Sequence, residues 1–184
     1  MGVVVITHRT GDLIGLPLAK AHLRVDHNDH DTLIRAHIEA SAAWLDGPRG
    51  WLGLCLGRQT LQSEQVGRMT RAGLVLPCGP VADILGVAFG SGDLEEPIEV
   101  DPDLFEVEAN RVRLKVGVVW PGPMLSPLKV TYVAGYAPDA LPGPVVSAIL
   151  LHLNILYEQP EDKELAALER ARDDLLSPLR VRTF

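Results

Sequence analysis

The chain has 184 residues, of which 47% are apolar and 22% are charged, and its net charge is −7. This length suffices for one domain with a substantial core, or for a small domain that carries an insert. The share of apolar residues excludes disorder over the whole chain. The acidic charge argues against a protein that grips nucleic acid, because basic residues that neutralise phosphates supply most of that affinity.

The opening run, Met1 to Ile6, is apolar but follows no basic region. It is too short for the core of a signal peptide or for a membrane span. Cys55 and Cys78 stand in no metal-binding or redox spacing, which favours reduced, buried thiols and leaves a single disulfide as an alternative. We therefore expect a protein that is made in the cytoplasm, remains there and has no membrane partner.

The first part of the chain, residues 1–55, is predicted to be helical. Pro17 suits the first turn of a helix that runs to about Val25. The polar run 26–31 then supplies N-cap candidates for a second helix, which ends at Gly47 and Pro48. The apolar stripe of this second helix consists of Leu33, Ile34, His37, Ile38, Ser41, Trp44 and Leu45.

The middle part, residues 56–136, changes from helical to alternating periodicity, and Gly and Pro recur every few residues. Residues 105–108 and 111–116 are expected to form a hairpin across Ala109 and Asn110. Further strands are predicted at residues 60–66, 73–77, 82–89 and 128–133. Several short strands separated by turns predict a small antiparallel sheet or barrel.

The last part, residues 137–177, is helical again. One predicted helix begins at Pro142 and ends near Pro160, and a shorter acidic helix follows. No linker rich in Ser, Gly or charge separates the parts, as two independent domains would require. The sequence therefore predicts an α+β protein in which a small helical bundle is interrupted by an antiparallel β insert.

The final residues, 178–184, form a short tail that is basic and apolar, although the helix before it is acidic. A frayed terminus is one interpretation. The other is a docking peptide, because alternating apolar and basic residues can add a strand to a sheet or anchor in a groove. The candidate docking residues are Leu179, Arg180, Val181, Arg182, Thr183 and Phe184.

The densest polar cluster is the run from Asp26 to Asp31, which contains His27 and His30. Its side chains are of the types that bind zinc and other divalent ions, but their spacing does not place a ligand set on one helix face. We favour a solvated loop whose Asp and Asn side chains cap the next helix. A small metal-dependent enzyme or ligand-binding domain that uses residues 26–31 remains the alternative.

No motif of phosphate binding or of nucleophilic catalysis is present in the sequence. The Gly-rich stretch 86–93 leads into an acidic turn and not into a helix, and neither cysteine has a placed histidine partner. His37 and His152 lie on apolar faces of predicted helices, where a packing role is more usual than a general base. We expect no enzymatic activity, no catalytic residue, no metal and no cofactor.

Several short sequence motifs follow one another along the chain, and their order is more specific than any one of them. The first ends in the sequence Leu-Arg-Val-Asp at residues 23–26, and the second has an acidic loop before an Ala-rich helix. All of them, in chain order, are residues 16–26, 29–44, 57–60, 76–81, 132–136, 141–142, 148–157 and 175–180. Together they resemble the head–tail connector, or adaptor, proteins of long-tailed phages and gene transfer agents. Residues 46–53 depart from this resemblance, because family members often continue there with a more polar helix end.

The resemblance implies a non-catalytic ring, twelve-fold like the portal, that lies between the portal protein and the stopper or tail-completion protein in the neck of the particle. The genome would pass through its channel without specific binding, and an acidic wall would help it slide. The resemblance also implies that the C-terminal tail inserts into the portal. A stopper or a tail terminator is a further possibility, but the flanking helices favour an adaptor.

Overall fold

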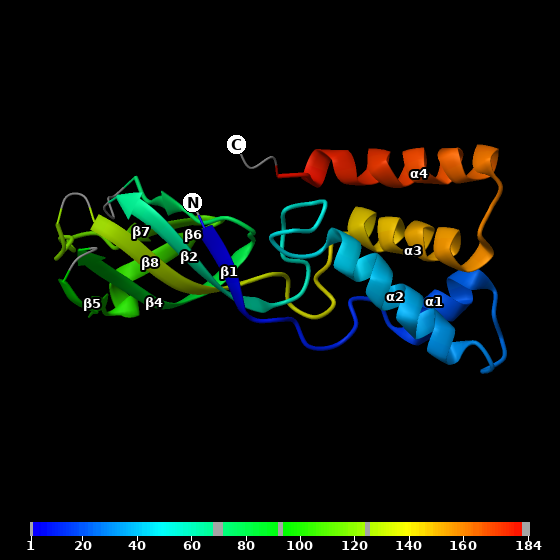
Figure 1. Cartoon of the computed structure of the whole chain (residues 1–184), viewed down its shortest axis with the longest axis horizontal. Helices are drawn as coiled ribbons and strands as arrows, with labels where there is room; N and C mark the ends of the chain where they lie inside the picture. The colour runs from blue at the N-terminus through cyan, green and yellow to red at the C-terminus, as the bar shows by residue number, and fades with distance from the viewer. Residues whose placement is uncertain (1, 68–71, 92–93, 124–125, 182–184) are drawn as a thin grey trace. The chain divides into compact units, whose positions relative to one another are not determined.

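The computed structural model describes residues 2–67, 72–91, 94–123 and 126–181. The chain divides into two compact units. The β unit comprises Met1–Arg9 and Gly57–Tyr136, and the helical unit comprises Thr10–Leu56 and Ala137–Phe184. The described residues form four α-helices and two antiparallel sheets (Figure 1), so the predicted α+β class is confirmed.

The β unit contains a five-stranded and a three-stranded sheet. In spatial order, the five strands are β1 (Gly2–Thr7), β2 (Gln59–Gly67), β8 (Ser126–Ala134), β4 (Val81–Ser91) and β5 (Leu94–Val100), and every neighbouring pair is antiparallel. The smaller sheet has the order β3 (Leu74–Val75), β7 (Arg111–Leu114) and β6 (Phe105–Glu108), and the short 3-10 helix η1 (Pro102–Leu104) precedes β6.

The core of the β unit lies on one face of the five-stranded sheet. Strand β8 shows this most clearly, because every second residue from Ser126 to Ala134 is buried. At its centre the side chain of Tyr132 is fully buried, and its hydroxyl donates a hydrogen bond of 2.7 Å to the carbonyl oxygen of Pro77. Phe105, Val112 and Leu114 of the smaller sheet are also buried.

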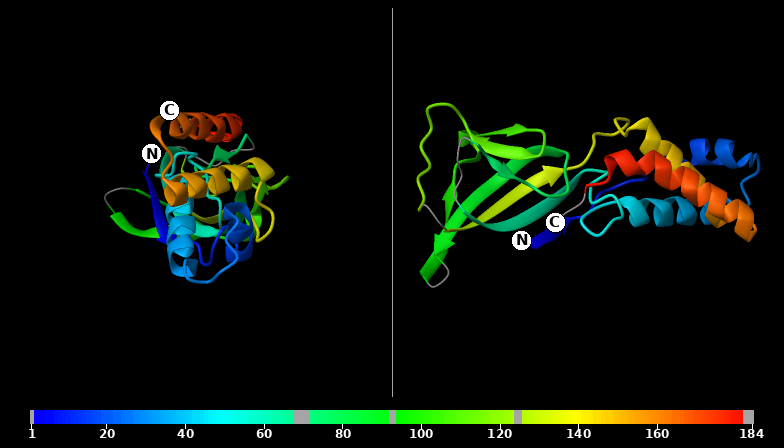
Figure 2. Two further views of the ribbon diagram at one scale, coloured as in Figure 1. Left: turned by 90° about the vertical axis from the view of Figure 1, so that its right-hand side faces the viewer. Right: turned by 90° about the horizontal axis from the view of Figure 1, so that it is seen from above.

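The helical unit contains α1 (Leu16–Leu23), α2 (Asp31–Leu45), α3 (Gly143–Glu158) and α4 (Asp162–Leu176), and the 3-10 helix η2 (Ser177–Leu179) follows α4. Helix α3 contacts each of the other three helices. Figures 1 and 2 show it between α4 on one side and α1 and α2 on the other. Among the described residues, no helix combines the length and the apolar character that crossing a bilayer requires.

The apolar stripes of α2 and α3 supply much of the core of the helical unit. The buried residues of these stripes are Ile34, Ile38, Ala42 and Leu45 on α2 and Val145, Ala148, Ile149 and Leu153 on α3. Their spacing of three and four residues places each set on one side of its helix. Burial of such side chains is the main favourable term in bringing together segments that are distant in sequence.

The structure differs from the sequence-based prediction at the N-terminus. Residues 1–55 were expected to be helical, but Gly2–Thr7 forms the edge strand β1 and belongs to the β unit. The reason is the local sequence, since Val3, Val4, Val5 and Ile6 are β-branched and favour extended backbone. Opposite them, β2 provides a ladder partner through the pairs Val3–Ser63 and Val5–Leu61.

Candidate docking site

A cluster of aromatic and cationic side chains lies on the helical unit where the C-terminal tail begins. It consists of Trp44 on α2, Trp51 in the following loop, His152 on α3, Arg172 on α4 and Arg180 after η2, and we call it the aromatic cluster. The rings of Trp44 and His152 are stacked, with centroids 4.8 Å apart, and those of Trp44 and Trp51 are 5.8 Å apart. Both Arg side chains lie over an indole ring, a favourable cation–π geometry.

The loop after α2 positions Trp51 beside Trp44. The backbone N–H of Trp51 donates to the carbonyl oxygen of Trp44 at 2.9 Å, so the chain folds back on the end of the helix. Gly50 permits this turn, because a Cβ atom at that position would collide with the carbonyl oxygens of Leu45 and Asp46. The turn brings the two indole rings to the same side of the helical unit, with their centroids 5.8 Å apart.

Arg172 is a nearly buried cation, with only 6% of its surface exposed. Its Cζ atom lies 4.2 Å from the ring centroid of Trp44, and its Nε and Nη2 atoms each lie 2.9 Å from Oδ1 of Asp173. Its Nη1 donates to Nδ1 of His152 at 2.9 Å. Because arginine can only donate, Nδ1 of His152 accepts, and the proton of the neutral ring is on Nε2.

The environment of His152 disfavours its charged form. Burial lowers the pKa of His152 below its ordinary value of 6.5, and the charge of Arg172 lowers it further. The carboxylates of Glu169 and Asp173 act in the opposite direction and are weaker. His152 therefore serves as a neutral acceptor for the Arg172 guanidinium and stacks on Trp44. No proton-transfer partner for it is found among the described side chains.

The described half of the predicted docking tail, Leu179 to Val181, lies against the helical unit. The Cζ atom of Arg180 is 4.4 Å from the ring centroid of Trp51, and the backbone N–H of Val181 donates to the carbonyl oxygen of Leu52 at 3.0 Å. Beside them is a hollow of about 190 Å³ whose walls include Asp173 and Asp174. Arg182, Thr183 and Phe184 lie outside the described residues.

The sequence predicted a docking tail, but it did not predict the residues against which the start of this tail packs. Trp44 was predicted as part of the apolar stripe of its helix, and the structure shows that it and Trp51 are half-buried members of the aromatic cluster. Arg180 and Trp51 are far apart in the sequence, and no local pattern marks a pair of this kind. The one available signal was the presence of indole and guanidinium groups, which pair frequently in proteins.

The polar run 26–31 is engaged in contacts within the helical unit. Nδ1 of His30 lies 2.6 Å from the hydroxyl of Tyr157 on α3, and Nζ of Lys20 donates to Oδ1 of Asn28 and to Oδ1 of Asp31, both at 2.7 Å. The expected capping by Asp or Asn is wrong: the N-cap residue of α2 is His30, whose side chain makes no capping bond. In the parts of the chain that the structure describes, no three His, Cys, Asp or Glu side chains are grouped as metal ligands.

Comparison with known proteins gives matches among solved structures alone. No protein-family model matches the chain, and no curated protein matches it. A chain from the neck of an empty gene transfer agent particle, computed with C6 symmetry, superposes with a TM-score of 0.70 at 20% identity, covering 100% of this chain and 98% of that one. A chain from the virion of a native gene transfer agent particle gives 0.71 at 20% identity with the same coverage. A chain from a native neck computed with C12 symmetry gives 0.55 at 19% identity, covering 97% of each chain. The protein therefore shares its whole fold with chains of gene transfer agent particles.

The lowered pKa of His152 predicts a pH-dependent stability of the helical unit. The unfolded state binds a proton on this ring more readily than the folded state, so stability is lost as the pH falls below about 6.5. The loss should approach about 1.4 kcal/mol for each unit by which folding depresses the pKa. His152→Gln keeps an acceptor for Arg172 but does not titrate, so urea unfolding at pH 8 and pH 5 should show a smaller loss for this variant than for the wild type. The exposed His22→Gln is the matched control, and equal losses for His152→Gln and the wild type would contradict the prediction.

The contact between Arg180 and Trp51 predicts that the start of the tail is protected. An exposed cation–π contact contributes about 0.5–1 kcal/mol, so its loss should raise the population of the released tail about two- to fivefold. Trypsin should therefore cleave after Arg180 about two to five times faster in Trp51→Ala than in the wild type, as measured by mass spectrometry of initial products. Trp51→Phe retains a ring face and should be cleaved at a rate closer to that of the wild type. Unchanged cleavage in Trp51→Ala would show that the ring does not hold the tail.

Proposed function

We propose that this chain is a structural head–tail connector, or adaptor, subunit in the neck of a phage-like particle. The observation that carries the proposal is the extent of the structural match. The matches to chains from gene transfer agent particles cover 97–100% of this chain, so they include the β unit and both segments of the helical unit. A shared small domain would account for only part of such a match, and fold alone does not specify function.

The proposed assembly is a homo-oligomeric, twelve-fold ring between the portal protein and the stopper or tail-completion protein. The superposed chains come from necks described with C6 and C12 symmetry, which supports a cyclic arrangement. The subunit would be made in the host cytoplasm and incorporated into the neck of the particle. Its role is mechanical, and no catalytic residue, metal or cofactor is part of the proposal.

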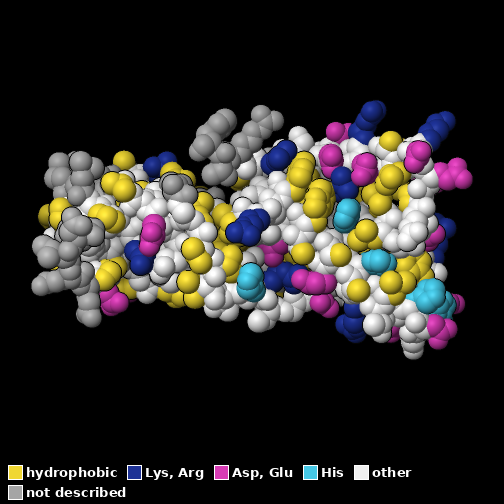
Figure 3. All heavy atoms as spheres, in the orientation of Figure 1, with side chains coloured by type: hydrophobic (Ala, Val, Ile, Leu, Met, Phe, Trp, Pro, Cys, Tyr) yellow, Lys and Arg dark blue, Asp and Glu magenta, His cyan; other side chains and the backbone are white. Residues whose placement is uncertain are grey.

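The charge distribution supports a channel through which DNA passes without being held. The helical unit has 14 Asp and Glu residues against 9 Lys and Arg, and the β unit has 10 against 8. On the face that Figure 3 shows, side chains of both signs lie along α4, and the described residues there form no continuous basic track for a phosphate backbone. An acidic lining repels phosphates, which keeps passing DNA mobile.

The C-terminal tail is the proposed portal anchor, through Leu179, Arg180, Val181, Arg182, Thr183 and Phe184. Its start is held by the Trp51 ring and by the backbone bond between Val181 and Leu52. A fixed starting point reduces the conformational entropy that the remaining residues lose when they bind. Arg182 and Phe184 are of the residue types that most often dominate binding energies at interfaces.

The tail predicts a separable effect on attachment. Deletion of Pro178 to Phe184 should abolish binding to portal-containing heads, because it removes all the proposed anchor residues while the helices remain. The sharper variant is Arg182→Glu with Phe184→Ala, which leaves the contacts of Arg180 and Val181 in place and should weaken attachment at least tenfold. Sedimentation of the chain with purified heads measures the attachment.

The matched control is Lys163→Glu, which reverses a charge at an exposed position on α4. It should attach like the wild type, and circular dichroism should show that all variants are folded. Equal attachment of the wild type and of the chain that lacks residues 178–184 would contradict the proposed anchor.

A further inference from the structure

The five-stranded sheet has one face that no other described element of the β unit covers, and we call it the open face. Strand pairing places Glu64, Lys129, Ala88 and Glu99 in one row across β2, β8, β4 and β5. Neighbouring residues on a strand point to opposite faces, so this row lies opposite the buried Phe89 and its neighbours. The row is therefore the outer surface of the sheet.

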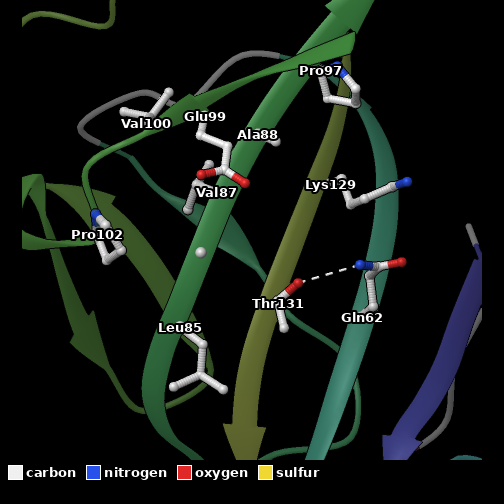
Figure 4. Close-up of a pocket in the computed structure, with 11 residues that line it drawn as sticks. Gln62, Leu85, Val87, Ala88, Pro97, Glu99, Val100, Pro102, Lys129 and Thr131 are labelled. Carbon is white, nitrogen blue, oxygen red and sulfur yellow. Dashed lines mark hydrogen bonds between the residues drawn. The ribbon is translucent and has the colours of Figure 1, made fainter.

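A trough of about 440 Å³ lies on the open face. Its floor is low because Gly86 and Ala88 have little or no side chain, and a Cβ atom added at Gly86 would meet nothing within 4 Å. Leu85, which is half exposed, and the two prolines Pro97 and Pro102 line it (Figure 4). The trough is thus a partly apolar depression that can accept small aliphatic side chains.

One carboxylate at this trough has no hydrogen-bond or ion-pair partner among the described residues. Nζ of Lys129 lies 3.3 Å from Oε1 of Glu64, so the lysine already has an acidic neighbour. Glu99 is exposed and projects from β5 toward β4 in Figure 4, and across the described residues it makes no hydrogen bond or ion pair. The open face therefore offers a cation a position beside its apolar floor.

The loop after β7, residues 115–123, carries two strongly exposed aliphatic side chains. Val116 is 90% exposed and Val119 is 84% exposed, more than the other large apolar side chains that the structure describes as exposed. They lie three residues apart in one loop, and apolar side chains that gather at one place on a surface can mark an interaction site. The loop is held in place, because the Trp120 ring packs 5.3 Å from that of Phe89 and its Nε1 donates to the carbonyl oxygen of Pro123. We call this segment the valine loop.

The valine loop and the trough lie on opposite sides of the five-stranded sheet. Trp120 packs against Phe89, which points away from the open face, whereas Ala88 beside it forms the floor of the trough. The loop also carries one charge, on Lys115, which is exposed and has no ion pair among the residues that the structure describes. The loop thus combines apolar side chains with one cation. The trough combines a low, partly apolar floor with the carboxylate of Glu99 and with Lys129, whose ammonium group is already paired with Glu64.

We propose that the valine loop of one copy of this chain docks in the open-face trough of a second copy, with Lys115 paired to Glu99 of that copy. Both surfaces are partly apolar, and Lys115 and Glu99, which have no ion pair among the described residues, are opposite in charge. Because they lie on opposite faces of the same sheet, one copy can use both at once. Such a contact is heterologous, and heterologous contacts close into rings or continue into filaments, whereas isologous contacts stop at a dimer.

This inference specifies the contact between ring neighbours, and its link to a neck ring rests on the proposed function. A bilayer and a different neck protein are other possible occupants of an exposed aliphatic loop. The opposite charges of Lys115 and Glu99 favour a second copy, because this chain itself carries both halves of the proposed contact. The experiment separates these possibilities.

Disulfide trapping in solution tests the contact directly. The full chain carrying Val119→Cys and Ala88→Cys is oxidised at about 1 mM, a concentration at which contacts as weak as about −4 kcal/mol are populated. The expected product is a ladder of dimers, trimers and larger species on non-reducing gels, because each copy offers both halves of the contact. The control replaces Val119→Cys by Val75→Cys, another exposed valine of the β unit, and should give no ladder above background.

A charge swap tests the proposed ion pair on the same gels. Lys115→Glu and Glu99→Lys should each reduce the yield of the trapped ladder at least threefold, and the chain with both changes should recover it. Absence of a ladder, a product that stops at the dimer, or a ladder equal to that of the Val75→Cys control would overturn the proposal. Binding to anionic vesicles that depends on Val116 and Val119, without a ladder, would equally overturn it in favour of a lipid surface.

The result of the disulfide-trapping experiment does not depend on the result of the attachment experiment that tests the proposed function. If the ladder is absent but the wild-type chain attaches to portal-containing heads through its tail, the inference fails and the neck role stands. If the ladder forms but no attachment occurs, the contact between copies stands and the neck role fails.

Discussion

The apolar stripe of α3 is the constraint on which the rest of the helical unit depends. The unit is built from two segments that the β unit separates in sequence, and α3 is the helix that contacts the other three. Its buried residues, Val145, Ala148, Ile149 and Leu153, join α1 and α2 from the first segment to α4 from the second. A large-to-small substitution in this stripe therefore affects the whole unit, because a cavity in a shared core weakens every helix that contacts it.

The packing of α3 against the other helices also forms the surface on which the C-terminal tail begins. Trp44 comes from the first segment and His152, Arg172 and Arg180 come from the second, so the aromatic cluster exists only when the two segments are together. A nearly buried Arg172 is tolerated because its donors are satisfied by His152 and Asp173 and its flat face lies on Trp44. The neutral state of His152 is part of this arrangement, since a second positive charge would repel the guanidinium.

The local periodicity of the sequence predicted most helices and strands. It failed where the structure of a segment depends on contacts with residues that are distant in the sequence. The helix Asp31–Leu45 follows from its stripe, and the hairpin of β6 and β7 was correctly placed across Ala109, which has the left-handed φ of 55° that its turn requires. The position of β1 depends on its pairing with β2, and the seat of Arg180 depends on Trp51, and neither partner can be recognised from the local sequence. The trough likewise results from strand register, because Lys129, Ala88 and Glu99, which line it, come from three different strands.

The most direct test of the proposed function is an image of an assembled neck from particles produced with this chain. Cryo-electron microscopy of that neck should show twelve copies of the chain in one ring next to the portal, with each C-terminal tail inserted into the portal protein. A neck without density for this fold, or with the fold at a position that makes no portal contact, would contradict the account.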